Sequence, residues 1–550
     1  MFLVIFTHKR LMNYSIMGDM MDLEYMKILS KKIVFIKKYR DKLVKQMITR
    51  MVVVLIVVCI FMTSCTSKPS VKENKEGTYI EPSKKVNLEG TSFENLLLPS
   101  NYNIRKFEGT TLNFIVENNL YANILSHESE EFSEITGINI KIRAVDFDTL
   151  FQKVTLDLIE QAGKYQLIYV DPYQTLNRFY NYLEVMNPYT KNQKLPQVAG
   201  FPRDFFENQT VVSSYFEENK NLYTVPFDST TMILYYRKDI FDKYRDRFMK
   251  EKGYDWTPGS SDFTWTRYCE VAKWIDENVP NEEVKYGSGI MAMQHNSIFC
   301  EFSNILASYG GDYFTDEKIN TLGLKKFNKI NVLDQNFTEA LDMYKKIARV
   351  SAPQSVNWNW TDLASEFRNG EVAMMANWDE NYTYVEDVKN SEVAGNVGYC
   401  ILPYGDTRSA NIYGGSGIGI NKYATDEEKQ AAWLYIVWAT SKEMQLKVLN
   451  HPDGGSMPTR KSAYQDPLLN NPDQDTMLKH MDAVLHAWRP ENIYLRPKIS
   501  NFYDVEKVLI SNLHNMIEFD LDSGETGQKM YQELETIKLD GRQPEEETIE

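Results

Sequence analysis

The residue types that most often carry catalysis form no recognisable constellation in this sequence. Its seven histidines are scattered, and it contains no HExxH zinc motif, no GxxxxGK[ST] phosphate loop and no GxSxG nucleophile elbow. Carboxylates are so numerous that a glycosidase-like pair cannot be selected without geometry. Three well-separated cysteines lack any CxxC spacing, and a disulfide among them stays open: Cys269, Cys300 and Cys400. We therefore expect no catalytic residue, no metal and no cofactor.

Binding chemistry is left, and polar residues at the ends of predicted strands are its first candidates. The pattern predicts strands over 111–116, 138–145 and 165–170, with helices over the segments that end near 136 and 162. This alternation implies a parallel sheet with helices on both faces, in which ligands sit beyond the carboxyl ends of the strands. Glu117-Asn118-Asn119 and Asp171-Pro172-Tyr173 occupy two such places, and Asn118, Asp171 and Tyr173 are the candidates among them.

An apolar run over residues 51–62 separates a basic N-terminal segment from the rest of the chain. Arg50 precedes the run, and Thr63-Ser64-Cys65 follows it. A basic flank, a short apolar core and small residues at the exit are the parts of a secretory signal. The run is shorter than the ~20 apolar residues that a spanning helix needs. Residues 62–65 resemble the lipobox of bacterial lipoproteins, whose cysteine becomes the lipid-modified first residue.

These patterns predict how the first 105 residues are organised. We expect a lipoprotein signal peptide over 47–64, lipidation of Cys65 and a flexible polar tether over 65–105. Residues 1–46 are interpreted as an extension that precedes a true start at Met26 or Met47. A plain cleaved signal with a coincidental cysteine is the alternative.

The distribution of charge argues against nucleic acid as a partner. The net charge of the chain is −15, yet residues 1–64 contain eleven Lys and Arg against four Asp and Glu, so that the remainder carries −22. Such an acidic body repels nucleic acid and anionic membrane surfaces. Aromatic residues make up 13% of the chain, which suits a protein that offers flat faces to a ligand.

Five segments, in order, resemble family 1 extracellular solute-binding proteins of bacterial ABC transporters. The first contains Pro226-Phe227 followed by Leu234-Tyr-Tyr-Arg-Lys-Asp-Ile-Phe241, where the family's chain crosses between lobes. The others are a Thr-Trp-led helix, a Phe-x-x-Gly-x-x-Ala-Met strand before a Trp, a Gly-rich strand with an Ala-Trp helix, and a Pro-x-Arg loop, at residues 263–275, 367–378, 414–441 and 455–461. Each segment is weak alone, but their common order is specific.

This resemblance implies a two-lobed α/β fold of the type II periplasmic-binding-protein kind, with a hinge between the lobes. The solute-binding body would span 106–540, followed by a polar tail over 541–550. The first lobe would hold about 106–225 and 400–450, and the second about 226–399 and 451–540.

The resemblance also implies a carbohydrate ligand. Sugars combine hydroxyl groups with apolar C–H faces, so a sugar site needs polar side chains together with aromatic rings. Asn118, Asp171, Asp228 and Arg460 would supply the polar contacts. Trp378, Tyr173 and Trp265 would stack, and Gly414 and Gly415 would let the backbone approach the ligand. Trp378 could equally be a core residue, Trp265 a helix-entry packing residue and Arg460 a structural ion pair.

The function that follows is capture of a carbohydrate, in particular an oligosaccharide, and its delivery to the permease subunits of an ABC transporter. The protein would be a monomer held by its lipid on the outer face of the cell membrane, and it would not be an enzyme. The alternatives are a surface-anchored carbohydrate hydrolase or lectin, and a sugar-sensing receptor subunit.

Overall fold

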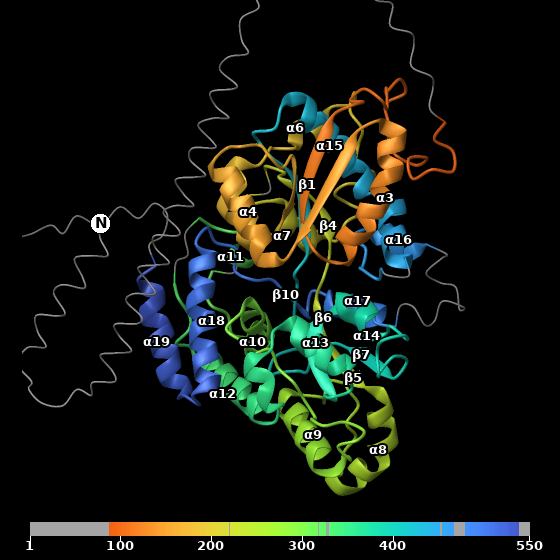
Figure 1. Cartoon of the computed structure of the whole chain (residues 1–550). Coiled ribbons are helices and arrows are strands. Elements are labelled where there is room, and N and C mark those ends of the chain that lie inside the picture. Colours follow the sequence, from red (N-terminus) through yellow and green to blue (C-terminus); the bar gives the residue numbers. More distant parts are fainter. Residues whose placement is uncertain are drawn as a thin grey trace, which may run out of the picture. The chain divides into compact units, whose positions relative to one another are not determined.

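A computed structural model describes residues 87–218, 220–316, 318–325, 329–451, 454–466 and 479–537, all of which belong to one compact unit (Figure 1). The predictions for the extension, the signal peptide, Cys65 and the polar tail lie outside these residues. Within the described residues, no helix combines the length and the apolar character needed to cross a membrane. Cys269, Cys300 and Cys400 are free thiols.

The first lobe is built on a five-stranded sheet with the order β2-β1-β3-β9-β4. Strands β1 (Thr111–Glu117), β2 (Asn139–Val145) and β3 (Leu167–Val170) are parallel, as predicted. Strand β9 (Ser416–Ile420) runs antiparallel to both β3 and β4 (Thr224–Asp228). The sheet is therefore mixed, because a strand from late in the chain inserts between two early ones.

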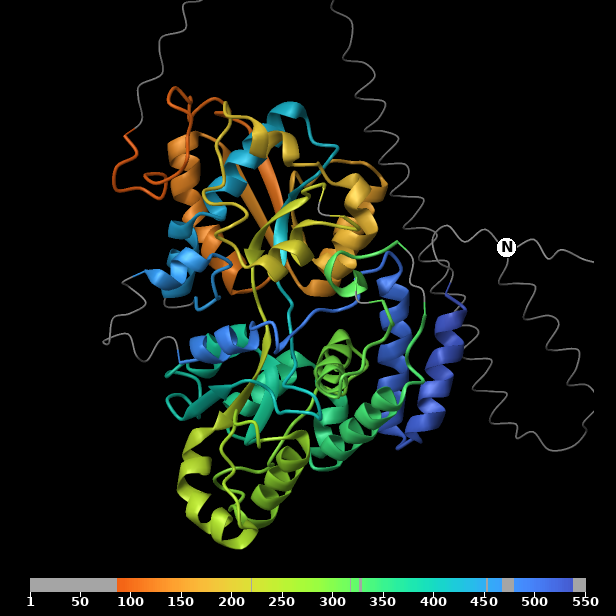
Figure 2. The same cartoon turned by 180° about the vertical axis from the view of Figure 1, so that it is seen from behind.

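Helices cover both faces of this sheet. Figures 1 and 2 show α3 (Leu120–Thr136) and α16 (Lys442–Asn450) on one side and α4 (Phe147–Ile159) on the other. Helix α3 ends at Gly137, whose φ of 73° is left-handed, as expected of a glycine C-cap. Helix α15 (Asp426–Ala439) begins with the predicted capping box between Thr425 and Glu428. The remaining elements of this lobe are η2 (Pro172–Leu176), α5 (Asn177–Phe179), η3 (Tyr180–Tyr182), α6 (Asn187–Lys191) and α7 (Glu207–Ser214).

The folded body begins earlier than residue 106. Phe93 is fully buried, with its ring centroid 5.6 Å from that of Phe132 and 6.3 Å from that of Trp438. The indole nitrogen of Trp438 donates to Ser92 Oγ at 2.7 Å. The expected tether boundary at 105 was wrong, because a few apolar residues within a polar stretch are enough to anchor it to the core.

The second lobe is built on a three-stranded antiparallel sheet in the order β6-β5-β7. Its strands are β5 (Met232–Arg237), β6 (Met374–Trp378) and β7 (Val397–Cys400), and a separate pair joins β8 (Asn411–Ile412) to β10 (Ile493–Tyr494). The longer helices around them are α8 (Lys238–Lys252), α9 (Trp265–Asn278), α10 (Asn296–Ser308), α12 (Gln335–Arg349), α13 (Trp360–Arg368), α18 (Phe502–Glu518) and α19 (Ser523–Glu535). Shorter elements are α11 (Lys318–Thr321), η4 (Pro353–Asn357), η5 (Asp379–Asn381), α14 (Tyr382–Val385) and α17 (Met481–Ala487). In contrast to the expected second-lobe range 451–540, η6 (Lys461–Gln465) is hydrogen-bonded to Asp204 of the first lobe.

Two separate hydrophobic cores define the lobes, and their limits differ from the expected ones. Residues 401–413 pack into the core of the second lobe, and the chain returns to the first lobe only with β9. The chain crosses between the lobes at 228–232, at 413–416 and a third time between α16 and α17. The first two crossings are joined to each other, since the Gly414 amide donates to the Thr230 carbonyl at 2.8 Å.

Candidate ligand-binding site

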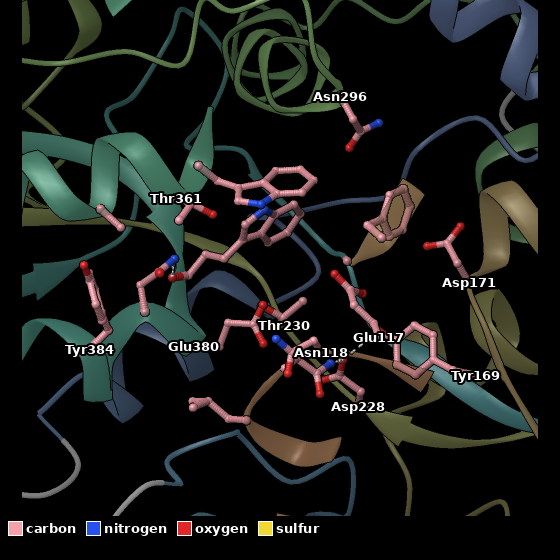
Figure 3. A pocket seen from close by; sticks show the side chains of 18 of the residues that line it. Glu117, Asn118, Tyr169, Asp171, Asp228, Thr230, Asn296, Thr361, Glu380 and Tyr384 are labelled. Carbon is pink, nitrogen blue, oxygen red and sulfur yellow. Dashed lines mark hydrogen bonds between the residues drawn. The ribbon is translucent and has the colours of Figure 1, made fainter. Parts of the chain in front are cut away.

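A cavity of about 350 Å³ lies between the lobes at the crossings (Figure 3). Its wall combines carboxylates, amides and aromatic rings from many elements, and Arg496 is the only basic side chain among the described residues that line it. The lining residues are Glu117, Asn118, Asn119, Leu120, Asn123, Phe147, Tyr169, Asp171, Asp228, Thr230, Asn296, Trp360, Thr361, Ala364, Trp378, Glu380, Asn381, Tyr384, Gly414 and Arg496.

The carboxyl end of β1 leads directly into the cavity. Glu117 is the last residue of the strand, Asn118 is exposed, and Asn119 caps α3 by accepting from the amide of Ala122 at 3.0 Å. The side-chain amide of Asn119 also donates to Asp228 Oδ2 at 3.2 Å. One short turn therefore starts a helix and fixes a carboxylate from another strand.

Asp228, at the end of β4, has one carboxylate oxygen held by the protein. Its Oδ2 accepts from the Tyr169 hydroxyl at 2.8 Å in addition to Asn119. The residue is only 1% exposed. Burial raises the pKa of Asp228 to about 6.

Asp171 follows β3 and starts η2. Its Oδ1 accepts from the amides of Tyr173 and Gln174 at 2.8 and 2.7 Å. On its other side, Oδ2 lies 3.9 Å from a guanidinium nitrogen of Arg496. The same guanidinium lies 3.9 Å from the centroid of the Tyr173 ring, so the cation is held between a carboxylate and an aromatic face.

The second lobe contributes the segment that follows β6. Trp378 ends the strand, Asp379 is buried behind the cavity, and Glu380 lines it. Asp379 Oδ1 accepts from the Thr231 amide at 2.7 Å and from the Thr230 hydroxyl at 2.9 Å. This pair of hydrogen bonds ties the segment to the first crossing, so the wall and the hinge are one connected structure.

Aromatic side chains line the cavity from both lobes. The rings of Phe147 and Trp360 meet edge to face, with centroids 6.3 Å apart, and the His295 ring also meets Trp360 edge to face, with centroids 4.5 Å apart. Trp378 is 8% exposed and packs over Gly414, where a Cβ atom would come within 2.7 Å of the indole ring. Glycine is thus required at 414 to admit the tryptophan. Flat apolar faces of this kind stack on sugar rings and also attract cations.

The ionisable groups of the cavity are mainly acidic. Burial, followed by the charges of Asp228 and Asp171, raises the pKa of Glu117 to about 8. Burial, followed by Asp228 and Glu117, raises the pKa of Glu380 well above its usual range. Burial also raises the pKa of Asp171, although the positive charge of Arg496 opposes the rise. The carboxylates therefore lie close enough together to disfavour one another's ionisation.

The structure places five of the nine expected ligand-binding residues on the cavity wall: Asn118, Asp171, Asp228, Trp378 and Gly414. The other four lie outside that wall. Tyr173 is buried beneath Arg496, and Trp265 is buried at the start of α9 with its indole nitrogen donating to Ser308 Oγ at 3.1 Å. A Cβ atom on Gly415 would meet the Tyr413 hydroxyl at 2.1 Å, so close protein packing explains this glycine.

Arg460 belongs to the structural framework of the first lobe. It is 1% exposed and pairs with Asp204 Oδ2 at 2.8 Å. Its guanidinium also donates to the carbonyls of Thr440 and Ala199, both at 2.6 Å. Arg460 does not line the cavity, because acceptors from distant segments already bind its Nε and Nη1 atoms, and a contact with ligand stays a prediction.

Several cavity residues were not identified from the sequence. Glu117 stands at one of the two strand ends where the sequence places the ligand, but it was not chosen as a contact, and Tyr169 lies within the strand that precedes Asp171. Trp360, Glu380 and Arg496 carry no local signal of this kind. They reach the cavity only through the packing of the second lobe.

A cavity between two α/β lobes that are joined by crossing segments defines the class of two-lobed binding proteins with the type II fold, as predicted. Comparison with known proteins then identifies the family. The model of the bacterial extracellular solute-binding protein family matches residues 122–446. The chain belongs to this family, which is one of binding proteins.

Named relatives and solved structures agree with this assignment. A protein of Sinorhizobium fredii named "Probable amino-acid ABC transporter periplasmic-binding protein" is 23% identical over 348 residues, covering 62% of this chain and 70% of that protein. The mannitol-binding protein of Pseudomonas aeruginosa is 23% identical over 341 residues, covering 60% and 69%. The structure of an ABC transporter solute-binding protein from Agrobacterium radiobacter in complex with ribitol has a TM-score of 0.64 at 21% identity, covering 78% of this chain and 98% of that one.

Proposed function

We propose that this protein captures a carbohydrate outside the cell and delivers it to the permease subunits of an ABC transporter, without catalysing a reaction. Membership of the extracellular solute-binding family supports the general role. The observation that carries the choice of ligand is the wall of the cavity. It combines two indole rings with amide, hydroxyl and carboxylate groups from both lobes, which matches the apolar faces and hydroxyl groups of sugars.

The neighbouring cavities favour an oligosaccharide. The central cavity, at about 350 Å³, is near the lower end of the ~300–1,000 Å³ typical of small-molecule sites. A cavity of about 480 Å³ shares Phe147 and Asn296 with it, and one of about 850 Å³ shares Leu120 and Tyr384. Further space for ligand thus adjoins the central cavity in two places. A single sugar ring bound in the central cavity would leave this further space empty.

Binding would act through closure of the lobes. A ligand that contacts Asn118 on the first lobe and Glu380 on the second gains its full set of interactions only when the lobes are together. Its binding energy then favours the closed arrangement. Closure gives the permease a signal that distinguishes loaded from empty protein.

Membrane attachment is part of the same proposal. Lipidation at Cys65 would hold a monomeric binding protein on the outer face of the cell membrane beside its permease. Replacing Cys65 by Ser should release the protein or leave its precursor unprocessed, while the ligand affinity stays unchanged. A Cys65→Ser protein that is processed and retained at the membrane like the parent would contradict the lipid anchor.

The central experiment is calorimetry of the soluble body, beginning near residue 87, against a panel of mono- and oligosaccharides, polyols, amino acids and peptides. We expect an oligosaccharide to bind more tightly than its component monosaccharides, and to be recovered intact after prolonged incubation. Binding confined to amino acids or peptides would contradict carbohydrate capture. Cleavage of the sugar would instead support the alternative of a surface hydrolase.

A single substitution tests the proposed stacking surface. Trp378→Ala should weaken oligosaccharide binding at least tenfold, because loss of a stacked ring removes about 1–3 kcal/mol. Phe519→Ala is the control, since Phe519 is 62% exposed in the second lobe and does not line the cavity. Unchanged affinity of a folded Trp378→Ala protein would remove this residue from the site.

A further inference from the structure

Three carboxylates from two lobes lie around the same part of the central cavity. Figure 3 shows Glu117, Asp228 and Glu380 near one another, with Asp171 to one side. Glu117 and Asp228 end two strands of the first lobe, whereas Glu380 belongs to η5 of the second. Closure of the lobes would therefore bring these carboxyl groups together, and their mutual repulsion contributes to the raised pKa values of Glu117 and Glu380.

Among the described residues, no cation forms an ion pair with Glu117, Asp228 or Glu380, although the charge of Arg496 partly opposes the rise in the pKa of Glu117. Arg496, the one basic residue among the described lining residues, is engaged with Asp171 and the Tyr173 ring. Glu380 Oε2 is buried, and no hydrogen-bond donor among the described residues reaches it. Asp228 Oδ2 accepts from the side chains of Asn119 and Tyr169, and the backbone of Ser229 also stabilises the Asp228 carboxylate, but none of these donors is a cation.

A metal ion is not the counter-charge that this geometry favours. Among the described residues, no three or more His, Cys, Asp or Glu side chains are grouped closely enough to hold one. Flat aromatic rings line the same cavity, namely Trp360, Trp378 and Phe147. Carboxylates beside aromatic faces are the usual surroundings of a bound organic ammonium group.

We infer that the ligand carries a protonated amine that binds among Glu117, Asp228 and Glu380, so that the captured carbohydrate is an amino sugar or an oligosaccharide containing one. This inference rests on the proposed function and specifies its substrate class. Hydroxyl groups of a neutral sugar can hydrogen-bond to these carboxyl groups but do not offset the mutual repulsion that raises the pKa values of Glu117 and Glu380. An ammonium group donates three hydrogen bonds and also cancels charge.

The rest of the cavity favours a sugar over a linear polyamine. Arg496 would repel a second positive charge, whereas it can donate to a hydroxyl or ring oxygen. Five asparagines line the cavity, and their side-chain amides suit the hydroxyl groups that a polyamine lacks: Asn118, Asn119, Asn123, Asn296 and Asn381. The aromatic rings likewise offer broad faces that match a sugar ring better than a methylene chain.

Calorimetry with three disaccharides of the same linkage isolates the amine. The probes are a β-1,4-linked glucosamine disaccharide, its di-N-acetyl derivative and the corresponding glucose disaccharide, at pH 6.5 and low ionic strength. We expect the glucosamine disaccharide to bind at least tenfold more tightly than either neutral compound. Equal or tighter binding of a neutral disaccharide would overturn this inference and leave carbohydrate capture intact.

A charge-removing variant tests the location of the amine. Glu380→Gln keeps the shape of the side chain and should weaken binding of the glucosamine disaccharide at least tenfold, with less than a threefold change for neutral sugars. Glu392→Gln is the matched control, because Glu392 is an exposed acidic residue of the same lobe outside the cavity wall. Equal losses for charged and neutral sugars in Glu380→Gln would contradict recognition of an amine at this position.

Failure of the inference and failure of the proposed function give different results. If a polyamine such as spermidine binds while no saccharide does, carbohydrate capture and the amino-sugar inference both fall. If neutral saccharides alone bind, only the inference falls. Preferential binding of the glucosamine disaccharide, lost in Glu380→Gln and kept in Glu392→Gln, supports both.

Discussion

Arg460 shows how a single residue type can serve binding or architecture. Its guanidinium is surrounded by Asp204 and by the carbonyls of Thr440 and Ala199, and it lies 4.5 Å from the centroid of the Phe205 ring. A buried charge with this many acceptors stabilises the fold only while its partners remain. Arg460 therefore joins the loop after α16 to the segment before α7.

Arg460→Ala should destabilise the first lobe by about 3–5 kcal/mol, because Asp204 would be left without its cation in a largely buried place. Ligand affinity should change less than threefold, measured under conditions where the variant is folded. Urea unfolding and calorimetry check the two quantities. A large loss of affinity at unchanged stability would return Arg460 to the binding site.

At the scale of elements, two helix caps differ in what they contribute, because one lies on the surface and the other lies at the cavity. Thr425 caps α15 through a capping box on the surface of the first lobe. Asn119 caps α3 and also donates to Asp228 at the cavity. Both caps satisfy amides that the helix leaves free, but only one of them also holds a cavity carboxylate.

We expect Thr425→Ala and Asn119→Ala each to lower the free energy of unfolding by about 1 kcal/mol, the usual cost of a lost N-cap. Only Asn119→Ala should also weaken ligand binding, by tenfold or more, because Asp228 loses one of its side-chain donors. Chemical denaturation and calorimetry of both variants measure the difference. Similar affinities in the two variants would show that Asn119 acts on the helix alone.

At the scale of the whole molecule, buried carboxyl groups make stability depend on pH. Glu301, in α10, is 3% exposed and accepts from the Met291 amide and the Tyr344 hydroxyl, both at 2.9 Å. Burial raises its pKa to about 8. The folded protein thus keeps a proton on Glu301 at pH values where the unfolded chain has lost it.

The free energy of unfolding should therefore fall as pH rises from 5 to 7, with Glu301 contributing on the order of 1 kcal/mol per pH unit. His480 opposes the trend below about pH 6.5, because burial lowers its pKa to about 4 and the unfolded chain takes up that proton. Glu301→Gln should flatten the slope relative to the parent. Identical slopes in urea titrations of the two proteins would contradict this assignment.

Local sequence features determined much of the first lobe. The pattern of apolar residues in 111–170 predicted three strands and two helices. The helix caps at Gly137 and Thr425 could also be predicted, because a cap involves only neighbouring residues. Strand ends then pointed to Asn118 and Asp171, since parallel strands bring their carboxyl ends to one edge. The order of five short segments was sufficient to recognise the family.

Only the tertiary structure decided which side chains share the cavity. Glu117 and Glu380 meet although 262 residues separate them, and Trp360 and Arg496 join them from other parts of the second lobe. Arg460 does not line the cavity, because it forms an ion pair with Asp204, which is far away in the sequence. The sequence by itself determined the elements, the class of protein and part of the cavity edge, because those depend on neighbouring residues and on short ordered motifs. The remaining wall and its acidic character depend on long-range packing, which no local pattern records.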